Sequence, residues 1–192
     1  MNYPTYVIVN GKKYDINTDF RIAIKCLEIA EDGSIGDTER ALAIVYKLFG
    51  EEGLNDKDNM EKLLELAVKY LRCGEEPVDN KEKKDVDLTQ DEKYIKSSFK
   101  YDYQYDPYEK DYLHWWEFWN DLCNLSNNEF GSCCILNRIR QIRNYDVSKI
   151  TDAKEKQQMI EAKKRVALKQ TKKMSRKERE SSIKFFEEFF KK

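Results

Sequence analysis

Apolar residues recur at intervals of three and four along most of this 192-residue chain, which is the periodicity of amphipathic α-helices. Three such stretches follow one another at 19–30, 37–49 and 57–73, and glycines separate them. The chain has only 7 glycines and 3 prolines, too few for a turn-rich all-β fold. We therefore predict a mainly α protein whose first three helices bury one core, with Gly74 as the C-terminal cap of the third.

One short segment departs from this helical pattern. Two β-prone runs within 6–16 flank Asn10-Gly11, a pair that tolerates positive φ at both central positions of a tight turn. An isolated hairpin is marginal in water, so it should lie on the helices. The predicted fold is a helical domain with a small N-terminal β-hairpin.

Composition divides the chain further. Segment 75–88 is charged and almost free of apolar residues, which predicts a linker or an exposed loop. Thr89-Gln-Asp-Glu92 fits a capping box and predicts a helix start, as do similar motifs at 126–129 and 175–178. The expected units are a hairpin with three helices at 1–74, the linker at 75–88, an aromatic-rich helical unit at 89–150, and a basic helical extension at 151–192.

Charge is uneven along the sequence, although the net charge is −1. From Asn137 to Lys192 there are 18 Lys/Arg and 8 Asp/Glu, so the C-terminal part of the chain is basic and the part before it is acidic. Such a tail suits an acidic protein surface or nucleic acid. The strongest basic run, Lys163-Lys164-Arg165, has acidic residues interleaved around it, and no nucleic-acid-reading motif occurs. A solvated helix face explains it better.

The sequence offers little for catalysis. His114 is the one histidine, and it lies in an aromatic stretch where a packed side chain is the simpler reading. Glycine-rich phosphate loops and zinc-ligand spacings are missing, and the five cysteines fit free thiols in a reducing cytoplasm. We expect no catalytic residue, cofactor or metal. We also expect no membrane span, because no apolar stretch approaches eighteen residues, and no signal peptide.

Two aromatic groups suggest binding to another protein. Trp115, Trp116, Phe118 and Trp119 exceed what one buried helix face needs, so part of this surface is a candidate partner site; a fully enclosed core is the alternative. Near the C-terminus, a stripe of phenylalanines follows a basic stretch. It either docks on its own domain or a sister subunit, or binds a groove of another protein. Its members are Phe185, Phe186, Phe189 and Phe190.

Motifs spread along the chain resemble a known family. The most specific is Tyr112-Leu-His-Trp-Trp-Glu-Phe118, and Arg143-Asn-Tyr-Asp-Val-Ser-Lys-Ile150 follows it. Further matches are Asn10-Gly11-Lys12 with Tyr14-Asp-Ile-Asn-Thr-Asp-Phe-Arg21, then Tyr70-Leu-Arg-Cys-Gly74, then Asp91-Glu-Lys-Tyr-Ile-Lys-Ser-Ser-Phe99 with Tyr103. Together they resemble the bacteriophage family named after gene product fifteen, over about residues 3 to 170. Gln104-Tyr105-Asp106-Pro107 departs from the family's usual turn.

The resemblance implies a protein of the phage tail module with no catalytic residues to transfer. It implies a tail-assembly chaperone in the host cytoplasm, which shields amphipathic segments of the tape measure protein before the tail tube polymerises. Tail tube protein is a further expected partner, and self-association fits such a role. The alternatives are a structural or adaptor protein of the tail and a nucleic-acid-binding protein that uses the basic C-terminal region.

Overall fold

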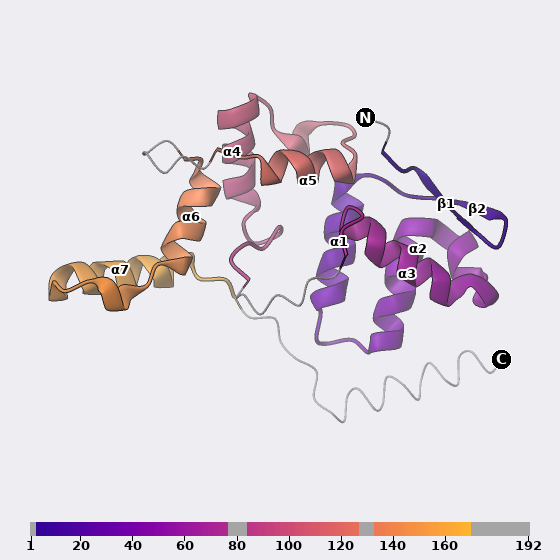
Figure 1. The fold of residues 1–192 in the computed structure, drawn as a ribbon, viewed down its shortest axis with the longest axis horizontal. Coiled ribbons are helices and arrows are strands. Elements are labelled where there is room, and N and C mark those ends of the chain that lie inside the picture. The colour runs from indigo at the N-terminus through magenta and orange to yellow at the C-terminus, as the bar shows by residue number, and fades with distance from the viewer. Residues whose placement is uncertain (1–2, 77–83, 127–132, 170–192) are drawn as a thin grey trace. The chain divides into compact units, whose positions relative to one another are not determined.

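The computed structural model describes residues 3–76, 84–126 and 133–169 (Figure 1). Within these ranges the chain is mainly helical with one two-stranded antiparallel sheet, so the predicted fold class is confirmed. The strands are β1 (Tyr6–Val9) and β2 (Lys12–Asp15). The α-helices are α1 (Phe20–Glu31), α2 (Asp37–Asn55), α3 (Met60–Leu71), α4 (Glu92–Tyr103), α5 (Trp115–Cys123), α6 (Ile135–Asn144) and α7 (Ala153–Val166), with short 3-10 turns at Lys57–Asn59, Pro107–Glu109 and Val147–Lys149.

Backbone contacts divide the chain into two compact units. Unit 1 contains the described residues of 1–78 together with Tyr112–Phe118. Unit 2 contains the described residues of 79–111 and of 119–169. The sequence-based boundaries placed 112–118 in the second unit, whereas these residues make their contacts in unit 1. The helix α5 therefore supplies its first turn to one unit and the rest to the other.

The N-terminal hairpin forms around the predicted turn. Asn10 and Gly11 have φ of 50° and 80°, the left-handed region in which both residue types are tolerated. The register pairs Val9 with Lys12 and Val7 with Tyr14. The Tyr14 ring is fully buried, and its hydroxyl donates a 2.5 Å hydrogen bond to Asp56. One face of the hairpin is thus anchored on the helices.

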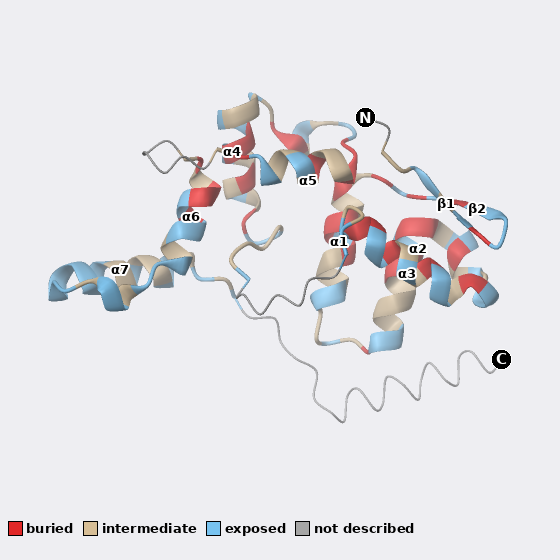
Figure 2. Cartoon of the chain, in the orientation of Figure 1, coloured by how far each residue is buried: buried red, intermediate tan, exposed pale blue. Residues whose placement is uncertain are grey.

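Helices α1, α2 and α3 enclose the core of unit 1, which Figure 2 shows as buried stripes on facing helices. The periodicity predicted these stripes because each helix buries positions three and four apart. The predicted stop at Gly50 coincides with a break in α2, where Gly50 has the non-helical angles φ 67° and ψ −160°; a second helical segment follows this kink and extends α2 to Asn55. Core side chains include Phe20, Ala23, Ile24, Ile44, Val45, Leu48, Leu63 and Ala67.

The third helix starts later than predicted, at Met60, because Lys57–Asn59 forms a 3-10 turn. It ends as predicted near Gly74, where Cys73 and Gly74 both have positive φ. The Gly74 N–H donates to the Lys69 carbonyl (2.9 Å) and the Cys73 N–H to the Tyr70 carbonyl (3.0 Å). These two bonds are the Schellman pattern that closes a helix.

Unit 2 contains α4, α6 and α7 around a buried ion pair. Arg143 of α6 donates to both carboxylate oxygens of Asp91 at 2.6 and 2.7 Å. Helix α4 begins at Glu92 with Asp91 as its N-cap residue, so the helix start predicted at Thr89 is displaced by two residues. Asp87 instead organises the preceding turn by accepting from the Thr89 and Gln90 N–H groups. The motifs at 126–129 and 175–178 extend into residues outside the described ranges.

Candidate interaction surface

The segment 112–118 is attached to unit 1 through its backbone. The Phe20 N–H donates to the Leu113 carbonyl at 3.0 Å, and the Trp115 N–H donates to the Thr18 carbonyl at 2.8 Å. These bonds join the first turn of α5 to the residues that open α1. Each aromatic side chain of the segment is consequently held in a defined orientation against unit 1.

Two of the predicted partner-binding residues lie in the core of unit 1. Trp115 and Phe118 are both 0% exposed. The Trp115 Nε1–H donates to the Leu71 carbonyl at 3.1 Å, and the Phe118 ring stacks on Phe20 with centroids 4.4 Å apart. These rings are enclosed by their own unit, so neither forms part of an exposed surface in this structure.

Trp116 lies at the boundary between core and solvent. The side chain is half-buried, and its Nε1–H donates to the Tyr70 carbonyl at 3.0 Å. Its ring stacks beside the Tyr70 ring with a centroid distance of 6.0 Å. Gly74 lies against the edge of the indole, so that a Cβ there would stand 3.4 Å from the nearest ring atom. The exposed part of the indole is therefore presented on a rigid support.

His114 holds the backbone of Trp116 in place. Its Nδ1 accepts from the Trp116 N–H at 3.0 Å, and its Nε2 lies 3.2 Å from the Pro4 carbonyl, which can only accept. The ring is therefore neutral, with its proton on Nε2. Burial lowers the pKa of His114, which favours this neutral form. The Tyr3 ring stacks on the imidazole with centroids 4.9 Å apart.

We call Tyr3, Tyr70, His114 and Trp116 the Trp116 cluster. Its chemistry is that of a contact surface. Burial raises the pKa of Tyr70, whose hydroxyl is buried and has no hydrogen-bond partner among the described residues. A neutral imidazole used as a helix cap and a protonated phenol form neither a nucleophile–base pair nor an anion site. The half-buried rings of Trp116 and Tyr3, packed on buried Tyr70 and His114, suit contact with apolar side chains.

Sequence reasoning missed Tyr3, Tyr70 and Tyr112 as parts of this surface. Tyr112 is 55% exposed, and its hydroxyl shares a 2.6 Å hydrogen bond with the Thr18 hydroxyl. Tyr3 and Tyr70 are far from Trp116 in sequence, and no local pattern links them. Only the attachment of 112–118 to unit 1 brings these rings together.

The other predicted binding residues have different surroundings. Trp119 belongs to unit 2, where it is half-buried. The C-terminal stripe, with Phe185, Phe186, Phe189 and Phe190, lies outside the described residues.

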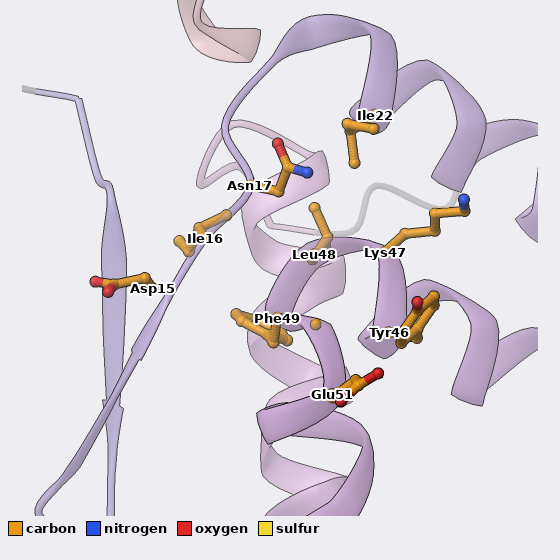
Figure 3. A pocket seen from close by; sticks show the side chains of 10 residues that line it. Asp15, Ile16, Asn17, Ile22, Tyr46, Lys47, Leu48, Phe49 and Glu51 are labelled. Carbon is orange, nitrogen blue, oxygen red and sulfur yellow. The ribbon is translucent and has the colours of Figure 1, made fainter.

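Unit 1 also has an open groove of about 550 Å³ beside the kink in α2 (Figure 3). Its walls come from the end of the hairpin, from α1 and from α2. The kink contributes directly, because it leaves the Leu48 carbonyl free to accept from the Asn17 N–H at 2.8 Å. The lining contains no histidine, cysteine or serine. It comprises Asp15, Ile16, Asn17, Ile22, Tyr46, Lys47, Leu48, Phe49, Gly50 and Glu51.

The described residues form neither a metal centre nor a membrane span. Histidine, cysteine, aspartate and glutamate side chains nowhere gather in threes around a point where a metal ion would fit. None of the helices in the described ranges combines the length and apolar character that crossing a bilayer requires.

Comparison with known proteins assigns the family. No curated protein and no solved structure matches the chain. The family described as Bacteriophage Gp15 protein matches residues 3–168, which include both units and the whole Tyr112–Phe118 segment. This match covers most of the 192 residues, so the chain belongs to the bacteriophage Gp15 protein family.

Proposed function

We propose that this phage protein is a tail-assembly chaperone that acts without catalysis in the host cytoplasm. Its client is the tape measure protein, whose amphipathic segments it covers until tail tube subunits replace it. The membership in the Gp15 family sets the phage context. The observation that carries the proposal is the pair of half-buried rings in the Trp116 cluster, Trp116 and Tyr3, which lie at the surface of unit 1 against the buried His114 and Tyr70.

The exposure of the aromatic side chains supports a narrower choice of residues for the client contact. Trp115 and Phe118 hold the segment in place from within the core, since both are fully buried. The contact then falls to Trp116, Tyr3 and Tyr112, which are half-buried or exposed. Tryptophan and tyrosine offer large apolar area with few rotatable bonds, so ordering them on binding has a low entropic cost.

The support beneath Trp116 strengthens this assignment. The indole Nε1–H donates to the Tyr70 carbonyl, and the backbone N–H of Trp116 donates to His114 Nδ1. A ring held in this way is already in one orientation before the client arrives, and such preorganisation raises affinity without any added contact. Release requires no bond-making chemistry, because tube subunits that bind the same client segments would displace the chaperone by competition.

Co-expression with the tape measure protein tests the proposal. The parent chain should raise the soluble fraction of the tape measure protein and co-elute with it on size exclusion. Trp116→Gln removes the exposed indole while keeping a good helix former, and should reduce both effects strongly. Tyr145→Ser is the matched control, because Tyr145 is a 42% exposed aromatic residue of unit 2, outside the Trp116 cluster.

The outcomes separate chaperone from tail component. No complex and no gain in solubility with the parent chain would contradict the proposal, as would equal loss in both variants, provided that circular dichroism shows both folded. Mass spectrometry of purified particles gives the second arm. A chaperone should be absent from the mature particle, whereas a structural or adaptor protein of the tail should be present.

A further inference from the structure

The outer edge of β1 carries backbone groups that nothing in the described chain pairs. The sheet has two strands, and β1 pairs only with β2. Thr5 accepts from the Ile16 N–H at 2.8 Å, which identifies Thr5–Ile16 as a hydrogen-bonded pair. Bonded and non-bonded pairs alternate in an antiparallel ladder. The N–H and C=O groups of Tyr6 and Ile8 therefore point away from β2.

Among the residues that the structure describes, no further strand pairs with this edge, and β1 itself carries none of the residues that usually prevent such pairing. Exposed edges are normally blunted by charged residues, by proline or by a covering segment. β1 has the sequence Tyr-Val-Ile-Val, without a charge, and Tyr6 and Ile8 are 48% and 62% exposed. The charged side chains of the hairpin, Lys12, Lys13 and Asp15, all lie on β2. Lys13 also holds the Tyr6 ring, with its Nζ 4.8 Å from the ring centroid.

We propose that this edge pairs with β1 of a second copy of the chain, antiparallel about a two-fold axis through Val7, to form a four-stranded sheet. The available edge sets this register. Pro4 has no N–H, and its carbonyl already accepts from His114, so pairing between the two β1 strands cannot include Pro4 before the start of β1. The Asn10-Gly11 turn limits the pairing after the end of β1. Val7 is the midpoint of what remains.

Only the Val7-centred register uses both outward-facing residues on each strand. It places Tyr6 opposite Ile8 of the second copy in two hydrogen-bonded pairs, an aromatic residue against a β-branched one, which is a favourable cross-strand combination. An axis through Tyr6 would bring Ile8 opposite a proline, and an axis through Ile8 would bring Tyr6 opposite the turn. The interface is thus self-complementary, as a two-fold dimer requires.

The exposed face is also compatible in charge. Within one copy, Tyr6 lies opposite Asp15 and Ile8 opposite Lys13. Across the proposed sheet, each row would read Asp15, Tyr6, Ile8, Lys13, with the last two residues from the second copy. Each row then has Asp15 at one end and Lys13 at the other, and no like charges lie next to one another across the new strand pair. The short strand predicts a weak dimer, populated at high micromolar concentration.

Sedimentation velocity of the full chain over a micromolar to submillimolar series measures the association. Ile8→Pro removes an outward N–H that β2 does not use, and should weaken the dimer by at least about tenfold. Ile8→Thr keeps the N–H and the β-branch but removes the same apolar surface, and should leave the dissociation constant within about threefold. A parent chain that stays monomeric throughout, or equal weakening in both variants, would overturn the proposal.

Oxidative cross-linking tests the register independently of how well Ile8→Pro folds. Directly opposed residues of a non-bonded antiparallel pair have Cα atoms about 4.5 Å apart, within disulfide range. Val7→Cys should therefore give a covalent dimer well above the level of the parent chain, whose native cysteines set the background. Tyr6→Cys should not, since Tyr6 does not face its own copy. Equal cross-linking of the two variants, or none, would refute the Val7-centred pairing.

Discussion

Removal of Arg143 should destabilise unit 2 more than any exposed substitution on the same helix. Asp91 is 1% exposed, and the Arg143 side chain is 9% exposed. Arg143→Met leaves the Asp91 carboxylate buried without its counter-ion, for which the expected loss of unfolding free energy is about 3–5 kcal/mol. The same change removes two more hydrogen bonds, from Arg143 Nε to the Val166 carbonyl at 2.6 Å and from Arg143 Nη1 to the Asp85 carbonyl at 2.7 Å.

Substitution of Asp91 should lower the unfolding free energy less than substitution of Arg143. Asp91→Asn keeps the volume, and Arg143 retains its two carbonyl partners, so we expect a loss of about 2 kcal/mol. The double variant should fall short of the sum of the single losses by at least about 1 kcal/mol, because the two side chains act as one unit. Arg138→Met, an exposed arginine of α6, is the control and should change stability by less than about 0.5 kcal/mol.

Urea unfolding followed by circular dichroism gives these free energies. Because the chain has two compact units, hydrogen exchange at the amides of α4 and α6 assigns the loss to unit 2. The reasoning fails if Arg143→Met is no worse than Arg138→Met. It also fails if the losses of the two single variants add in the double variant, which would mean that the pair is not coupled.

Two further predictions concern unit 1. Its stability should fall as the pH drops from 7 through 6.5 toward the lowered pKa of His114, because the folded state binds the proton less readily than the unfolded state. Protonation would also remove the Nδ1 acceptor of the Trp116 N–H. His114→Asn retains a capping acceptor and should flatten that part of a thermal-melt pH profile; an unchanged slope would contradict the assignment. Gly50→Ala should lower the unfolding free energy by about 1–3 kcal/mol, because the Gly50 angles φ 67° and ψ −160° are essentially restricted to glycine. Urea titration measures this loss, and a neutral effect would show that the kink is not needed.

The sequence predicted the local structure well wherever a residue pattern is compatible with only one backbone conformation or one buried face. Asn10-Gly11 specifies a tight turn because few residue pairs accept two positive φ angles. Helical periodicity identified the inward faces of α1, α2 and α3 because burial requires positions three and four apart. The family resemblance rested on Tyr112–Phe118 and the other quoted motifs, and the match to residues 3–168 confirmed it.

Other local predictions failed for identifiable reasons. Gly50 does end the first helical segment of α2, but the second segment, which runs from this kink to Asn55, was not predicted; at the kink the Leu48 carbonyl accepts from the Asn17 N–H of a distant segment. The helix start predicted at Thr89 gave way to Asp91, whose position is set by Arg143, fifty-two residues later. Both outcomes depend on partners that a local pattern does not contain.

The sequence by itself determined that this chain is helical, that it opens with a hairpin, and that its tryptophan-rich segment is its most distinctive part. Only the tertiary structure decided which rings of that segment face solvent. Trp115 and Phe118 enter the core because the backbone of 112–118 pairs with the residues that open α1, and Trp116 meets Tyr3 and Tyr70 for the same reason. Periodicity reports which faces are apolar, whereas exposure depends on contacts between residues far apart in the chain.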